Sequence, residues 1–285
     1  MVLSSSAPDL AFALARARLA NEKVKPSLLS HLESEDSAYA VHDRAHRLGI
    51  LGARIGWKVG VCTEKAYKSW GMRGPGIAPL FASGMWSSGA LVSDTIPVDA
   101  VEAEVAFILS EDLRPLQGGN LRTPQDVAVS ISHVLPVLEL CGTRLGVDAK
   151  PLGKLADFLL NAGVVLGDKR KVPSLPFLKQ LDMSACILTR NGGQNESDIF
   201  AGRGGSGAVH SHPLQSLAYL ANALNAQGDF LRAGDIVITG AATLCSQVRT
   251  GDSFCATFEG LPGSVRVRFT SITAETARGV GQARM

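Results

Sequence analysis

The sequence lacks the features of a membrane protein and of a nucleic-acid-binding protein. No uninterrupted apolar run approaches the roughly 20 residues that a membrane-spanning helix needs. The formal net charge of the 285-residue chain is +2, so no strongly basic surface is expected. We therefore expect no nucleic acid and no membrane as a partner. Aromatic residues are scarce at 6%, whereas 30 Gly and 13 Pro indicate many turns between short elements.

Cysteine is also scarce, and no two cysteines have the CxxC spacing. The five residues are Cys62, Cys141, Cys186, Cys245 and Cys255. Their odd number and scattered positions predict reduced core thiols in a cytoplasmic protein, not a disulfide framework or a zinc site. The N-terminus has no basic n-region, and Arg16 and Arg18 interrupt its apolar part. No secretory signal is therefore expected.

Two nucleotide or hydrolase motifs are missing as well. The glycine-rich stretch AGRGGSGAVHSH, residues 201–212, lacks the GK[ST] ending of a phosphate loop. It is also one residue short of the GxSxG of a serine-hydrolase elbow. Neither chemistry is indicated.

The pattern of apolar residues predicts an α+β protein. Helical spacing covers residues 9–21 and 36–48, and the chain changes character at Gly49. Short β-like runs follow, and two helices interrupt them, at 124–140 and 213–227. Pro136 is expected to kink or end the first of these helices. We expect a mainly helical portion, 1–85, that ends with the strand around Lys58, and a β-rich catalytic portion, 86–285.

The stretch VEAEVAFIL, residues 101–109, places two acids in a run that otherwise predicts a buried strand. Residues two apart in a strand point to the same face, so Glu102 and Glu104 should lie side by side. Buried like charges cost free energy unless a cation, a proton or a basic side chain compensates them. Some compensation is required here.

Glu139, an acid within the apolar run VLPVLEL, is the best third member. Three carboxylates without histidine or cysteine favour a hard cation, Mg²⁺ or Mn²⁺, with open positions for water and substrate. Buried salt bridges to Arg or Lys, or an edge strand with one face in water, are alternative explanations, and spacing alone does not favour the metal over them.

Lys58 stands between glycines in GWKVG, where backbone and ligand can approach closely. It could neutralise the carboxylates, hold a substrate anion or act in proton transfer. A lysine at the end of a strand that reaches into water is the simpler alternative.

Taken together, five stretches resemble the hydratase/decarboxylase branch of the fumarylacetoacetate hydrolase superfamily. They are GWKVG, VEAEVAFIL, VLPVLELCGTRL, LRAGDIVITGA and GSVRVRF, and the resemblance runs from about Ala38 to Phe269. It implies an α+β mixed β-sandwich roll with a helical N-terminal portion, assembled as a homo-oligomer. Enzymes of this branch process 2-oxo acids in the breakdown of aromatic compounds.

The resemblance also implies a site. Glu102, Glu104 and Glu139 match the ligands of Mg²⁺ or Mn²⁺, and Lys58 matches the catalytic lysine. Three further residues match substrate-binding positions: Arg144, Thr239 and Gly240. Arg144 is a candidate to bind a distal carboxylate if the substrate is a diacid, and a surface ion pair is an equally good explanation for it.

The chain departs from the family pattern at three places. Gly76 stands where the family has an aspartate that is believed to act in acid/base chemistry. The family's Asp-Ser-Arg reads Gly142-Thr143-Arg144, and its Asp-Asn pair reads Asp157-Phe158 with Asn161 displaced. These losses affect the expected acid and base more than the expected metal site.

The first hypothesis is a metal-dependent lyase that hydrates or decarboxylates 2-oxo or 2-hydroxydienoic acids. The alternatives are a hydrolase of an acylpyruvate carbon–carbon bond and a non-catalytic 2-oxo acid binding protein. The hydrolase would need a base near water, for which His31, Glu33, His42 and Asp43 are candidates. The hypothesis of a non-catalytic protein is based on Gly76, which stands where the family has an acid.

Overall fold

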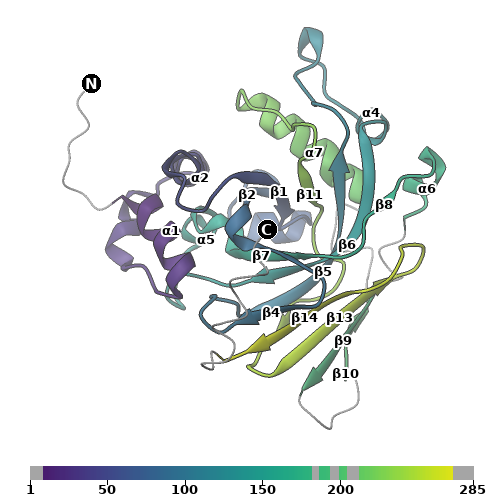
Figure 1. Cartoon of the computed structure of the whole chain (residues 1–285). Helices are drawn as coiled ribbons and strands as arrows, with labels where there is room; N and C mark the ends of the chain where they lie inside the picture. Colours follow the sequence, from purple (N-terminus) through teal and green to yellow (C-terminus); the bar gives the residue numbers. More distant parts are fainter. Residues whose placement is uncertain (1–8, 182–185, 193–198, 204–211, 272–285) are drawn as a thin grey trace.

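A computed structural model describes residues 9–181, 186–192, 199–203 and 212–271 (Figure 1). In this part of the chain the strands form two sheets. The first sheet has the order β2-β1-β11-β5-β6-β7-β3, with β12 beside β5 and β8 beside β6. Its strands are β1 Arg54–Gly60, β2 Gly76–Phe81, β3 Met85–Ser87, β5 Ala100–Leu109, β6 Ile131–Cys141, β7 Asn161–Leu166, β8 Arg170–Lys171, β11 Ile236–Ile238 and β12 Ser246–Gln247.

The second sheet lies below the first in Figure 1 and has the order β10-β9-β13-β14-β4. Its strands are β4 Ala90–Ser93, β9 Cys186–Gly192, β10 Ile199–Arg203, β13 Asp252–Phe258 and β14 Val265–Thr270. The β-like runs that the sequence indicated all contain strands of the structure, as expected from their Gly, Pro, Asn or Asp boundaries. These runs are residues 54–61, 101–109, 162–167, 184–190, 234–240, 253–258 and 264–269.

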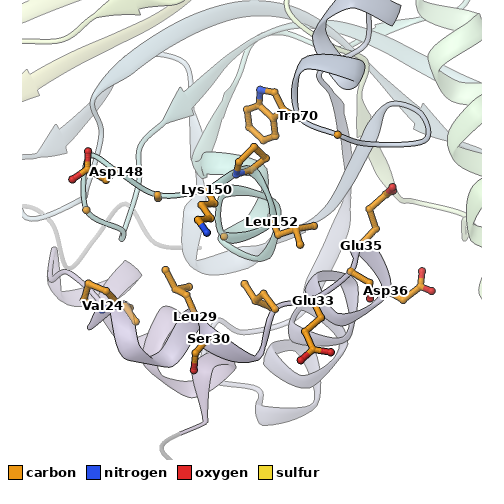
Figure 2. Close-up of a pocket in the computed structure, with 18 of the residues that line it drawn as sticks. Val24, Leu29, Ser30, Glu33, Glu35, Asp36, Trp70, Asp148, Lys150 and Leu152 are labelled. Carbon is orange, nitrogen blue, oxygen red and sulfur yellow. The ribbon is translucent and has the colours of Figure 1, made fainter.

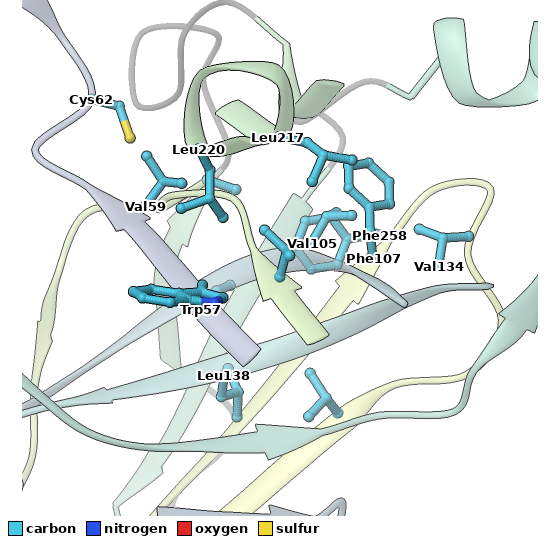
Figure 3. Packing of buried hydrophobic residues seen from close by; sticks show 14 of the residues in the cluster. Trp57, Val59, Cys62, Val105, Phe107, Val134, Leu138, Leu217, Leu220 and Phe258 are labelled. Atoms are coloured by element: carbon cyan, nitrogen blue, oxygen red, sulfur yellow. The ribbon is translucent and has the colours of Figure 1, made fainter. Parts of the chain in front are cut away.

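Strand β5 divides the interior of the molecule because its side chains alternate between two faces. Its odd-numbered residues, such as Val105 and Phe107, belong to the largest hydrophobic cluster. This cluster fills the space between the first sheet, the second sheet and helix α7, and Figure 3 shows Leu217 and Leu220 of α7 packed near Trp57 and Val105. The even-numbered residues face the other way, where Ala106 joins a smaller cluster.

The helices are short, and three of them gather at one side of the first sheet in Figure 1. These three are α1 Leu10–Ala20, α2 Glu35–Leu48 and α5 Pro151–Ala156, which share a second hydrophobic cluster. The other helices are α3 Glu64–Ser69, α4 Pro124–Ala128, α6 Leu175–Lys179, α7 Pro213–Ala226, and the 3₁₀ turns η1 Pro26–His31, η2 Ala82–Gly84, η3 Gln117–Gly119 and η4 Phe158–Leu160.

The expected helix over residues 124–140 is wrong beyond its first turn. Thr123 caps α4 as its side chain accepts from the backbone N–H of Asp126, and Pro124 is the first helical residue. The helix ends at Ala128, and residues 131–141 form β6. In β6 Pro136 lies opposite Val105, and its carbonyl accepts from Gly167 N–H. The apolar run is a buried strand, so Glu139 is a strand residue.

The expected division at residue 85 stays a prediction. Strands β1 and β2 precede that boundary, but they pair in the same sheet as β5 and β6. The homo-oligomer likewise stays a prediction. Among the described residues, no helix combines the length and the apolar character needed to cross a membrane.

Candidate metal centre and active site

The three glutamates predicted from the sequence come together on one face of the first sheet. Glu102 pairs directly with Glu139 across β5 and β6, and Glu104 lies two residues further along the same face. One carboxylate oxygen from each lies within 4.8 Å of the others. Glu104 and Glu139 are buried, and Glu102 is partly exposed. The cluster is therefore accessible from the Glu102 side.

Lys58 extends from β1 onto the same face and completes the cluster. Its Nζ donates to Glu139 Oε1 at 2.5 Å and to the carbonyl oxygen of Leu159 at 3.3 Å. Its side chain is only 5% exposed, so it does not reach into water as the simpler alternative had required. The neighbouring β1 residues Trp57 and Val59 point into the large cluster on the opposite face.

Glu104 and Glu139 each accept hydrogen bonds from defined partners, but one oxygen of Glu139 has none among the described residues. Glu139 Oε1 also accepts from Asn161 Nδ2 at 2.8 Å, and Glu104 Oε2 accepts from the backbone N–H of Gly240 at 2.8 Å. Glu139 Oε2 is buried and has no hydrogen-bond partner among the described residues. A buried carboxylate oxygen without a hydrogen-bond partner destabilises the folded protein, and coordination of a cation by this oxygen would remove that cost.

The pKa shifts within the cluster indicate that it has too little positive charge for its three carboxylates. Burial raises the pKa of Glu104 well above its ordinary value, and the charge of Glu139 raises it further. Burial and then Glu139 also raise the pKa of Glu102. Burial lowers the pKa of Lys58, but Glu139 and its neighbours outweigh burial, and the pKa is raised overall. One ammonium among three carboxylates leaves the cluster short of positive charge.

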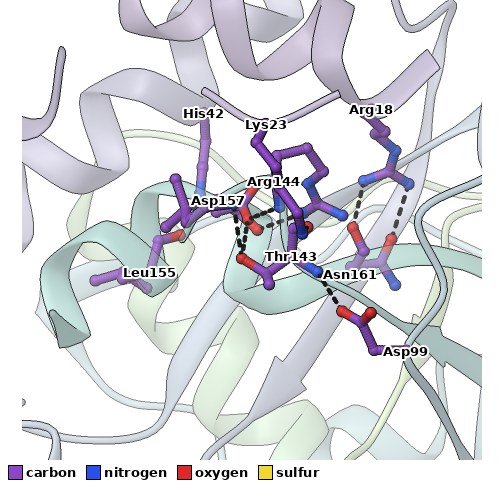
Figure 4. A network of polar contacts seen from close by, with 10 residues as sticks. Arg18, Lys23, His42, Asp99, Thr143, Arg144, Leu155, Asp157 and Asn161 are labelled. Atoms are coloured by element: carbon purple, nitrogen blue, oxygen red, sulfur yellow. Dashed lines mark hydrogen bonds and ion pairs between the residues drawn. The ribbon is translucent and has the colours of Figure 1, made fainter. Parts of the chain in front are cut away.

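A buried arginine on α1 orients Glu139 through Asn161, and sequence reasoning missed it. Arg18 donates through Nη1 to the Asn161 carbonyl at 2.8 Å and through Nη2 to Asn161 Oδ1 at 2.9 Å (Figure 4). With its amide oxygen occupied, Asn161 presents its Nδ2 to Glu139. The signal in the sequence was an arginine within the apolar stripe of a helix, which had been used only as evidence against a secretory signal.

Arg144 is tied to Asp157 rather than directed toward the cluster. Its side chain is fully buried, and its Nε donates to Asp157 Oδ1 at 2.6 Å. Its backbone N–H and Thr143 Oγ1 both donate to Asp157 Oδ2 (Figure 4). The departures from the family pattern at 142–144 and at 157–158 are thus linked by an ion pair. The substrate-binding role of Arg144 stays a prediction.

Thr239 and Gly240 lie beside the glutamate cluster. The Thr239 hydroxyl and the Gly240 N–H both form hydrogen bonds within the protein. Thr239 is buried, and its Oγ1 donates to the carbonyl oxygen of Val105 at 2.9 Å. The N–H of Gly240 holds Glu104 in place. Their expected contact with a substrate carboxylate stays a prediction.

The turn η4 places Leu159 beside the cluster in an unusual backbone conformation. Phe158, Leu159 and Leu160 have φ of 51°, 53° and 63°, a left-handed turn without glycine. Such residues cost roughly 1–2 kcal/mol each, so the surrounding contacts must hold the turn. A Cβ on Gly76 would lie 2.7 Å from Leu159 Cδ1. Leu159 thus occupies space that an acidic side chain at position 76 would need.

The four candidate hydrolase residues do not converge on the cluster. His42 is buried, and its Nε2–H donates to the Leu155 carbonyl at 2.8 Å. Asp43 and His31 are exposed. Glu33 lines a cavity of about 850 Å³ between η1, α2, α5 and the turn after α3, together with residues such as Trp70 and Lys150 (Figure 2). The four cluster residues are not part of that lining.

Comparison with known proteins identifies the family. No family model matches the chain. The chain is 30% identical over 267 residues to 2-oxo-hept-4-ene-1,7-dioate hydratase of Escherichia coli, which covers 90% of this chain and 95% of the relative. It is 31% identical over 269 residues to 2-keto-4-pentenoate hydratase 2 of Dechloromonas aromatica, at 92% and 97% coverage. The chain belongs to the hydratase/decarboxylase branch of the fumarylacetoacetate hydrolase superfamily.

Solved structures agree with this assignment and confirm the fold. The chain is similar to 4-oxalocrotonate decarboxylase of Pseudomonas putida G7, with TM-scores of 0.77 and 0.76 in two complexes. Identity is 24% and 25%, and each match covers 91% of this chain and 95% of the other. The first complex contains magnesium and adipate, and the second contains calcium and acetate. The predicted α+β fold of this superfamily is confirmed.

Proposed function

We propose that this family member is a divalent-metal-dependent lyase that adds water to a 2-hydroxydienoic acid, the enol form of a 2-oxoalkenoic acid. The observation that carries the proposal is the face of the first sheet where Glu102, Glu104, Glu139 and Lys58 meet. The hydratase relatives, at 30–31% identity over nearly the whole chain, favour hydration over decarboxylation.

The residues present fit a divalent cation. Three carboxylates and one ammonium leave negative charge in a largely buried cluster, and Glu139 Oε2 has no partner among the described residues. All three proposed ligands are hard oxygen donors, which suits Mg²⁺ or Mn²⁺. A similar protein is complexed with magnesium, and we infer Mg²⁺ or Mn²⁺ here. Bound between these carboxylates, the ion would supply Lewis acidity that polarises the 2-oxo group of a chelated acid.

Lys58 has the position and the positive charge to donate a hydrogen bond to a bound anion. The raised pKa keeps Nζ as an ammonium, and this group lies 2.5 Å from Glu139 Oε1 at the edge of the cluster. We infer that it donates to an oxygen of the bound acid and stabilises negative charge that develops there. The apolar side chain of Leu159, beside Gly60 and Gly76, keeps water away from this end of the site.

Product analysis tests the proposed reaction. Metal-stripped protein is supplied with Mg²⁺ and offered 2-hydroxypenta-2,4-dienoate, 4-oxalocrotonate and an acylpyruvate in separate reactions. We expect a 4-hydroxy-2-oxo acid from the first substrate, formed only with the metal and lost in Glu104→Gln. Carbon dioxide from the second substrate alone would favour the decarboxylase. Two acids from the third would favour the hydrolase, and metal-dependent binding of all three without turnover would favour a binding protein.

A further inference from the structure

Two cysteines lie next to the glutamate cluster, although they are far apart in the sequence. Cys141 follows Glu139 by two residues on β6, and its Sγ lies 3.7 Å from Glu102 Oε2. Cys245 precedes β12, where Ser246 pairs with Val101 of β5 in antiparallel register. One further step in this register brings Cys245 opposite Glu102. Glu102 is thus flanked by Glu139 on one side and by Cys245 on the other.

The side chains of Glu102, Cys141 and Cys245 also come together in space. The Sγ atoms of Cys141 and Cys245 and one oxygen of Glu102 lie within 4.8 Å of one another. Cys245 is exposed and Cys141 is partly exposed, so the expectation that all five cysteines are core thiols is wrong for Cys245. A cation can reach the two thiols from solvent. The chain separation of 104 residues hid this pair from any motif of short spacing.

We propose that Glu102, Cys141 and Cys245 form a second metal site, for a thiophilic divalent cation such as Zn²⁺. Cysteine thiolates and carboxylate oxygens are both zinc ligands, and a water molecule can complete a tetrahedron around an ion held by these three residues. Mg²⁺ avoids sulfur ligands, so the two overlapping ligand sets select different ions. Occupancy of this site does not depend on the proposed lyase activity.

The shared carboxylate makes the two sites antagonistic. Glu102 belongs to both groups of ligands, and a cation held by the cysteines withdraws part of its charge from Glu104 and Glu139. Two divalent cations at such close range also repel each other. Zn²⁺ therefore weakens binding of Mg²⁺ or Mn²⁺, and by linkage the hard cation weakens binding of Zn²⁺ by the same factor. The consequence for the proposed lyase is inhibition by Zn²⁺, an effect that does rest on the proposed function.

Spectroscopy with Co²⁺ tests the site without reference to turnover. Reduced, metal-stripped full-length protein is titrated with Co²⁺, whose bonds to thiolate give a near-ultraviolet charge-transfer band. We expect the band in the native protein and in Cys255→Ser, a partly exposed cysteine in the second sheet. We expect it to disappear in Cys141→Ser and in Cys245→Ser, and on addition of Zn²⁺. A native protein without the band, or a band that survives in both variants, would overturn the proposal.

Calorimetric titration with Mn²⁺ tests the antagonism. We expect one equivalent of Zn²⁺ to weaken Mn²⁺ binding at least about tenfold in the native protein, a typical allosteric coupling. In the double variant Cys141→Ser/Cys245→Ser, the same Zn²⁺ should change Mn²⁺ binding much less. Equal weakening in both proteins would mean that Zn²⁺ competes at the three glutamates, and the shared-site account would be wrong. Because neither measurement uses a substrate, failure here is distinguishable from failure of the lyase proposal.

Discussion

At the residue scale, the cluster depends on a chain of contacts that leads outward from Glu139. Its Oε1 accepts from both Lys58 and Asn161, and Asn161 is in turn held by Arg18. Hydrogen bonds therefore hold Lys58, Asn161 and one oxygen of Glu139 in place, and Oε2 of Glu139 is left available for a cation. Such support fixes a ligand in place before a metal arrives, which is the condition for tight and selective binding.

The role of Lys58 can be separated from metal binding. Lys58→Met keeps the length of the side chain and removes one positive charge beside the proposed cation. We expect Mn²⁺ to bind as tightly or more tightly, because repulsion is removed, while turnover falls at least about tenfold. Calorimetry and steady-state kinetics measure the two effects, with Lys68→Met on the exposed face of α3 as the control. An unchanged rate would assign Lys58 a structural role.

The Arg144–Asp157 pair should contribute strongly to stability. Both side chains are fully buried, and Asp157→Asn would leave the Arg144 charge without its partner. We expect a loss of about 3–5 kcal/mol in the free energy of unfolding, measured by urea denaturation. Asp36→Asn breaks an exposed ion pair with Arg73 and should cost less than about 1 kcal/mol. Similar losses in the two variants would contradict this assignment.

At the element scale, the sequence predicted the strands better than the helix that precedes Glu139. Alternation in VEAEVAFIL correctly places Glu102 and Glu104 on one face, because the period of a strand is two. In residues 124–140 the capping signals at Thr123 and Pro124 were correct, but they fix only where a helix begins. The end of the helix was decided by the pairing of β6 with its neighbours: Val137 and Leu138 lie between β5 and β7, and Val134 lies between β5 and β8. Local sequence contains no information on this pairing.

The packing of α2 on α5 should make the protein sensitive to acid. His42 of α2 donates to the Leu155 carbonyl on α5, and burial lowers its pKa from 6.5 to about 4. The unfolded chain binds this proton at a higher pH than the folded chain does. Stability from this residue is therefore complete above pH 6.5 and falls by up to about 3 kcal/mol as the pH drops to 4.

Unfolding by urea at several pH values measures this dependence. His42→Gln removes the titrating group, so the part of the slope between pH 6.5 and 4 that belongs to His42 should disappear. His31→Gln, an exposed histidine on η1, should leave the slope unchanged. A slope that is the same in His42→Gln and in the native protein would show that other groups govern the acid response.

At the scale of the whole molecule, the two faces of the first sheet differ in character: one is apolar, and the other contains the cluster of ionisable side chains. One face joins the second sheet and α7 around the largest cluster, while the other face presents Lys58 and the three glutamates. The helical cluster of α1, α2 and α5 approaches that second face through Arg18 and through the η4 turn. Helix α1 is thus linked to the glutamate cluster, because Arg18 donates to Asn161 and Asn161 donates to Glu139.

The sequence could predict that the three glutamates cluster, but it could not predict the residues that surround them. Glu102, Glu104 and Glu139 are acids within apolar runs, and such local anomalies are visible without a structure. The partners of Arg18 and Cys245 lie far from them in the sequence, so the sequence alone did not identify these partners. The ion pair between Arg144 and Asp157 was likewise not visible in the sequence, and the substrate-binding role of Arg144 stays a prediction.

The most direct test of the central claim is a calorimetric titration of metal-stripped protein with oxalate, a mimic of a 2-oxo acid enolate, with and without Mg²⁺. We predict that oxalate binds only when Mg²⁺ is present. Glu104→Gln should lose binding of both Mg²⁺ and oxalate, because a neutral amide is a much poorer ligand for a hard cation. Glu22→Gln, at an exposed position, should bind like the native protein. Oxalate binding without metal, or full Mg²⁺ occupancy in Glu104→Gln, would contradict the account.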